Sequence, residues 1–251
     1  MSQQASQSIL RFLTVAALTA ALYFVFGWLA VRYLSYAGGV AIIWPAAGVA
    51  VAAVLRYGLP GVLGALLGSL ATNYLFATPL AALAIGVGAA LETWLVWWIM
   101  SRTSSRPFSF GSMPDVARLC MIALPVASIA SAVMGASALL YLNLLEPQYY
   151  FQALLVWWSG DLTGAILLAP VLLSANAEDW RVERQVFKME WALVLLATVL
   201  MIWMMFNLNT SSLAELGEFL LVPLMLWVAL RFSAGAVAAL MLFAAFARLM
   251  S

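Results

Sequence analysis

The chain has 251 residues, 66% of them hydrophobic and 8% charged, with a mean hydropathy of +1.05. A soluble globular domain cannot keep so many apolar residues away from water, so the composition predicts a polytopic membrane protein whose main partner is the lipid bilayer. The formal net charge of +1 leaves no basic surface for nucleic acid. The absence of histidine excludes a histidine base, and the single cysteine, Cys120, gives no basis for a disulfide or zinc site. We expect no metal and no cofactor.

Apolar runs predict an all-α transmembrane bundle of eight to nine membrane segments. Residues 1–11 are predicted to form a cytoplasmic tail, and no cleavage site marks the first helix as a signal peptide. The membrane domain spans 12–251, with helices near 12–34, 38–56, 59–76, 79–101, 115–142, 150–175, 189–208, 218–231 and 234–249. The last two are separated because one straight helix would exceed a hydrocarbon core of about 30 Å. The alternative is a single tilted or broken helix, which gives eight crossings.

The distribution of basic residues predicts the orientation of the bundle. With the N-terminus in the cytoplasm, every Lys and Arg except Arg32 and Arg248 falls on a cytoplasmic connection. Glu146, Glu215 and Glu218 then lie on external loops.

Two carboxylates, Glu92 and Asp161, lie well inside predicted helices. Each costs about 2.5–3.5 kcal/mol at a helix centre, so an intramembrane acid is a functional-site hypothesis. No basic side chain is predicted at that depth, which leaves protons, hydrogen bonds or a bound cationic group as compensation. Both acids are predicted at roughly 16–20 Å from the outer boundary, so they can share one cavity.

Other residues near these acids are candidates for a pocket lining. Trp157, Asp161 and Gly164 share one helix face, and Gly160 with Gly164 forms a small-xxx-small pair that lets another helix approach. Trp44, Pro45, Asn73 and Trp158 add polar and aromatic groups. The structural alternatives are packing bulk for Trp157 and Trp158, an interhelical hydrogen bond for Asn73 and a helix kink for Pro45. Ser128, Ser131 and Gly135 are predicted to be helix contacts.

Several motifs occur together in a fixed order. They are WPAAGVA at 44–50, LRYG at 55–58, Pro60-Gly61, 68–73, Leu91-Glu92, WWSGDLTG at 157–164 and LAP at 168–170. From about residue 15 to the C-terminus the chain resembles the MASE type-one sensor domain, the integral-membrane input module of bacterial histidine kinases and diguanylate cyclases. The motif positions are Trp44, Pro45, Arg56, Asn73, Glu92, Trp158, Gly160, Asp161 and Pro170. Of these, Arg56, Gly160 and Pro170, together with Gly164, are expected to be structural.

The resemblance implies a multi-pass sensor of the bacterial inner membrane with a cytoplasmic N-terminus. It also implies a kinase or cyclase output domain or a docked membrane partner, a small ligand as one stimulus, and a homodimer. No output domain precedes Ser251, so this sequence is either an input domain of a longer protein or a stand-alone relative.

A small-molecule or cation-coupled carrier is the alternative function, because paired intramembrane acids also suit transport. An intramembrane protease is disfavoured. Trp158 stands where the aspartyl enzymes have their first glycine, and Asp115 and Asp179 lie at predicted cytoplasmic boundaries. The only lysine, Lys188, is in a cytoplasmic connection. We therefore expect no enzymatic activity.

Overall fold

The computed structural model describes residues 2–33, 41, 43–104, 108 and 112–173, together with 192–194, 196, 197, 199, 200, 228, 240 and 243. Within these residues the regular elements are all helices, which confirms the predicted all-α class. The predicted helices near 189–208, 218–231 and 234–249 lie largely outside the described residues. By its internal contacts the chain divides into two units, Met1–Ala169 and Pro170–Ser251.

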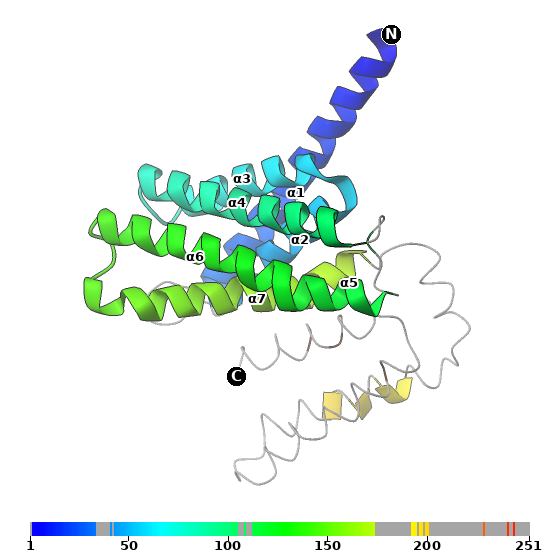
Figure 1. Ribbon diagram of the computed structural model, residues 1–251. Coiled ribbons are helices and arrows are strands. Elements are labelled where there is room, and N and C mark those ends of the chain that lie inside the picture. Colours follow the sequence, from blue (N-terminus) through cyan, green and yellow to red (C-terminus); the bar gives the residue numbers. More distant parts are fainter. Residues whose placement is uncertain are drawn as a thin grey trace. The chain divides into compact units, whose positions relative to one another are not determined.

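Four helical stretches are long and apolar enough to cross a membrane, and two of them are single helices (Figure 1). These are α1 (Ser2–Tyr33), whose apolar part starts at Ser6, and α4 (Pro79–Thr103). The helix α1 begins well before residue 12, whereas the cytoplasmic location of residues 1–11 remains a prediction.

The other two long stretches are composite. The first joins α5 (Met113–Arg118), a π-helical turn η1 (Leu119–Ala123) and α6 (Leu124–Tyr141). The second joins the short 3-10 helix η2 (Pro147–Tyr149) to α7 (Tyr150–Leu173), which contains Pro170. The described residues thus hold four membrane-length helices, and the predicted total of eight to nine is not supported.

Two further helices are shorter than predicted. The helix α2 (Pro45–Tyr57) has 13 residues and α3 (Leu59–Tyr74) has 16. At 1.5 Å per residue α2 is about 20 Å long, so the predicted helix 38–56 is corrected to a shorter helix that begins at Pro45. Pro45 occupies its first turn, where a missing N–H is tolerated, and therefore starts the helix instead of kinking it. Gly58, with φ +74°, separates α2 from α3 and allows the chain to reverse.

The short helix α2 lies at the centre of the first unit. It contacts α1, α3 and α4, and residues 45–54 are all buried. Around it, α1 packs on α3, α3 on α4, and α4 on α6. A Cβ at Gly68 would lie 2.6 Å from the Cβ of Tyr23, so this glycine lets α3 approach α1 closely.

Large apolar side chains cover the outside of the described helices. Leu18 on α1 is 60% exposed and Leu80 on α4 is 58% exposed. Such an outer surface suits hydrocarbon, because lipid tails solvate apolar side chains that water does not. The four long apolar helices and this surface identify a membrane-embedded protein.

Candidate functional site

The first residues of α2 are joined to the middle of α7. The backbone N–H of Trp44 donates to the carbonyl oxygen of Gly160 at 3.0 Å. A Cβ at Gly164 would collide with the Trp44 carbonyl, and one at Gly48 would lie 2.7 Å from the carbonyl oxygen of Gly164. Because neither position has room for a side chain, the two helices cross at near backbone contact. We call this crossing the α2–α7 joint.

The two intramembrane acids lie next to each other beside this joint. Asp161 on α7 is 3% exposed and Glu92 on α4 is 5% exposed. The two carboxyl groups interact with one another, and Ser131 of α6 adjoins both. One oxygen of each, Glu92 Oε1 and Asp161 Oδ2, is buried and has no hydrogen-bond partner within the described part of the chain. Such atoms are rare in folded proteins, since an unmet buried acceptor is costly, and they call for a functional explanation.

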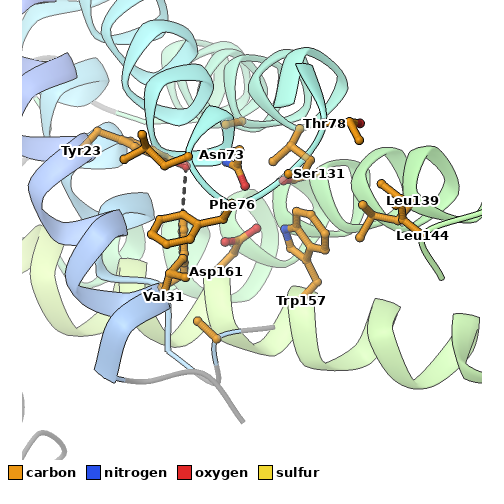
Figure 2. Close-up of a pocket in the computed structure, with 16 residues that line it drawn as sticks. Tyr23, Val31, Asn73, Phe76, Thr78, Ser131, Leu139, Leu144, Trp157 and Asp161 are labelled. Atoms are coloured by element: carbon orange, nitrogen blue, oxygen red, sulfur yellow. Dashed lines mark hydrogen bonds between the residues drawn. The ribbon is translucent and has the colours of Figure 1, made fainter. Parts of the chain in front are cut away.

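Asp161 forms part of the wall of a cavity of about 590 Å³. Figure 2 shows its carboxylate and the ring of Trp157 pointing from α7 into this space, with Phe76 opposite. The cavity extends to the connections between α3 and α4 and between α6 and α7. Its lining residues are Tyr23, Val31, Ala41, Trp44, Asn73, Leu75, Phe76, Ala77, Thr78, Ile85, Ala89, Ser131, Leu139, Leu144, Trp157 and Asp161. None of these described lining residues is basic.

Specific contacts fix the positions of two aromatic side chains that line the cavity, Trp44 and Trp157. The indole N–H of Trp44 donates to the Tyr23 hydroxyl at 3.0 Å, with the two rings edge to face at 6.3 Å. The ring of Trp157 rests on Gly135, where a Cβ would lie 2.5 Å from its Cη2 atom. Gly135 on α6 therefore makes room for the ring that lines the cavity.

The structure places the predicted site residues in three groups. Trp44, Asn73, Trp157 and Asp161 line the cavity, and Glu92 interacts with Asp161 without lining it. The Asn73 amide donates to the Ser69 carbonyl at 2.9 Å, within its own helix, so it makes an intrahelical bond.

The remaining predicted residues lie away from the cavity. The indole N–H of Trp158 donates to the Pro125 carbonyl at 3.1 Å, which joins α7 to α6. Pro45 begins α2, and Arg56 lies near its other end, where its guanidinium is 5.8 Å from the centre of the Tyr57 ring.

Most lining residues lie outside the predicted site, and three of them, Ser131, Tyr23 and Phe76, bear on its chemistry. Ser131 was assigned to helix contact only, yet it lines the cavity and adjoins both acids. Tyr23 and Phe76 gave no sequence signal, because a single aromatic residue in or beside an apolar helix is common in membrane proteins. Only the fold brings them opposite α7.

The described helices thus form part of an integral-membrane bundle with a ligand-sized cavity beside two acids. The MASE1 family model matches residues 13–251. The chain belongs to the MASE1 family and is a membrane sensory domain. Searches of curated proteins and of solved structures gave no match.

Proposed function

We propose that this chain is the input domain of a bacterial inner-membrane signalling system. A small ligand occupies the cavity beside Asp161, alters the α2–α7 joint, and thereby biases a cytoplasmic output of the histidine kinase or diguanylate cyclase type. Membership of the MASE1 family supports the sensory role. The output is either fused to the chain or docked on it.

One observation carries the proposal, namely that both sides of the α2–α7 joint line the cavity. The Trp44 side chain is part of the wall, and its backbone N–H is bonded to Gly160, the residue before Asp161. A ligand that touches Trp44 and Asp161 therefore acts on both partners of one close-packed crossing. Such a ligand shifts the equilibrium between two packing arrangements only when it binds one of them better.

The helix α2 offers a route from the cavity to the opposite end of the bundle. It begins next to Trp44, whose backbone N–H is bonded to Gly160 of α7, and it ends at Tyr57. Gly58 then turns the chain into α3. Arg56 near this end supports a cytoplasmic location under the positive-inside rule. A displacement of α2 at Trp44 would in this way reach the cytoplasmic surface.

The test joins the chain to a diguanylate cyclase domain and measures cyclic di-GMP in cells at matched membrane protein levels. Gly48→Ala disturbs the α2–α7 joint, Asp161→Asn changes the cavity, and Leu80→Ala on the exposed face of α4 is the control. We expect the first two variants to change output by at least about fivefold, the lower end of typical coupling between sites. Output equal to that of the unmodified chimaera in both variants would contradict the proposal.

A carrier is the second candidate, favoured by the unpartnered acid oxygens beside a cavity that reaches one end of the bundle. Proteoliposome uptake separates the two functions. Flux that depends on Asp161 would indicate a carrier, whereas binding without flux would indicate a sensor.

A further inference from the structure

We propose that the cavity beside Asp161 binds a small organic cation, a protonated primary amine carried on an apolar or aromatic body. This inference rests on the proposed function, because it names the ligand class of the same cavity. It is carried by an acid in the cavity wall with one oxygen unpartnered among the described residues, by the absence of a basic side chain among the described lining residues, and by four aromatic residues around the same space.

Asp161 lines the cavity, and its Oδ2 atom has no hydrogen-bond partner among the described residues although the residue is only 3% exposed. An ammonium N–H is the donor that such an oxygen lacks, and hydrogen bonds between ionised partners are the stronger ones. Glu92 interacts with Asp161 and so brings a second carboxyl group next to it, although Glu92 itself does not line the cavity. Among the described residues that line the cavity, no Lys or Arg offers an internal substitute.

The same surroundings disfavour other charged ligands. An anion would meet Asp161, and none of the described lining residues supplies a basic side chain to balance it. A hard metal ion would need several oxygen ligands. In the described part of the chain, no group of three or more His, Cys, Asp or Glu residues could hold a metal ion. A cation that brings its own apolar body fits better.

The rest of the wall fits that body. Tyr23, Trp44, Phe76 and Trp157 supply aromatic rings, and an ammonium group is attracted to ring faces. Ile85 and Ala89 add apolar surface from α4. A volume of about 590 Å³ lies within the usual range of small-molecule pockets, about 300–1,000 Å³. The cavity therefore accommodates an amine with an aromatic ring of its own.

The experiment is calorimetric titration of the full chain in lipid nanodiscs with 2-phenylethylammonium, and with 2-phenylethanol as a neutral probe of similar shape. We expect the ammonium to bind roughly 10- to 100-fold more tightly, the range for one hydrogen bond to a charged group. Asp161→Asn should abolish this preference while binding of the alcohol remains. Glu146→Gln removes an exposed acid near the α6–α7 connection and should leave the preference intact.

Phe76→Leu provides a second variant that does not depend on the stability of the acid pair, because Phe76 is 50% exposed. It should weaken binding of the ammonium several-fold through loss of an aromatic wall. Equal affinity for the two probes, a preference that persists in Asp161→Asn, or heat from sodium chloride alone that Asp161→Asn removes would overturn the inference.

The two proposals fail in different assays. If the alcohol binds and the ammonium does not, the cavity remains a ligand site and only the ligand class is wrong. The sensory proposal fails instead when Gly48→Ala and Asp161→Asn leave the cyclase output of the chimaera unchanged.

Discussion

The indole N–H of Trp44 donates to the hydroxyl of Tyr23 at 3.0 Å, which ties the residue before α2 to α1. The backbone N–H of the same tryptophan is bonded to Gly160 of α7. Trp44 therefore links three helices through two donors, and its ring is also part of the cavity wall. Its position depends on α1 and α7 together.

Tyr23→Phe should destabilise the protein by about 1–3 kcal/mol, because the Trp44 indole N–H loses its acceptor in a buried setting. Chemical unfolding in detergent micelles measures the effect. Tyr33→Phe is the matched control, since Tyr33 is 51% exposed at the end of α1. Equal stability of the Tyr23→Phe and Tyr33→Phe proteins would contradict a structural role for this bond.

Gly164→Ala should lower stability by about 1–3 kcal/mol, the usual effect of overpacking, because the added methyl group meets the Trp44 carbonyl. Gly88→Ala makes the same change in α4, where the nearest atom, the Ser131 carbonyl oxygen, would be 3.5 Å from the new Cβ. That distance is ordinary contact, so we expect no loss there. Thermal unfolding of both variants checks the difference, and equal losses would argue against a close α2–α7 joint.

Trp158→Phe should cost about 0.5–1.5 kcal/mol through loss of the hydrogen bond to the Pro125 carbonyl. Affinity for 2-phenylethylammonium should stay within about twofold, because Trp158 is not among the described residues of the cavity wall. Trp157→Ala should instead weaken that affinity. A larger loss of affinity for Trp158→Phe than for Trp157→Ala would reverse the roles of these neighbours.

Glu92→Gln should raise stability by about 1 kcal/mol, because its carboxamide can donate to the unpartnered oxygen of Asp161. In a double-mutant cycle with Asp161→Asn, the two changes should be non-additive by more than about 0.5 kcal/mol, as for residues in direct contact. Unfolding free energies of the four proteins give this coupling. Strict additivity would mean that the two carboxyl groups do not interact.

The orientation can be tested by cysteine labelling in a Cys120→Ser background, which removes the only native thiol. Glu146→Cys should react with a membrane-impermeant maleimide in intact spheroplasts, where the outer face of the inner membrane is accessible. Thr103→Cys, near the end of α4, should react only after permeabilisation. The reverse pattern would place the N-terminus outside.

Much of the helical fold could be predicted from the sequence. In lipid, the backbone N–H and C=O groups of an apolar segment must form hydrogen bonds within that segment, so a long apolar run predicts a helix. Helices such as α4 and α7 fall close to the predicted ranges 79–101 and 150–175. The start of α2 was missed, because continuous hydrophobicity does not reveal where a helix begins inside a bundle. The proline at position 45 was the available signal, since proline favours the first helical turn.

The candidate site was predictable in part, because a charged side chain in lipid is energetically costly. A carboxylate in an apolar segment stands out, so Glu92 and Asp161 could be identified and placed at similar depth. Ser131 could not be assigned to the site, because a serine hydroxyl inside a membrane helix can bond to its own backbone. Ser128 does so, with its hydroxyl donating to the Leu124 carbonyl at 2.6 Å.

The length of α2 also bears on how the protein is made. Thirteen residues are fewer than the roughly 20 that a segment needs to enter a bilayer as an independent helix. As the chain emerges during synthesis, α2 must therefore rely on α1, α3 and α4 for its place in the membrane. The acceptor for the Trp44 amide, Gly160, is made more than a hundred residues later. The centre of the bundle is thus completed only when α7 arrives, which makes its assembly a late step of biogenesis.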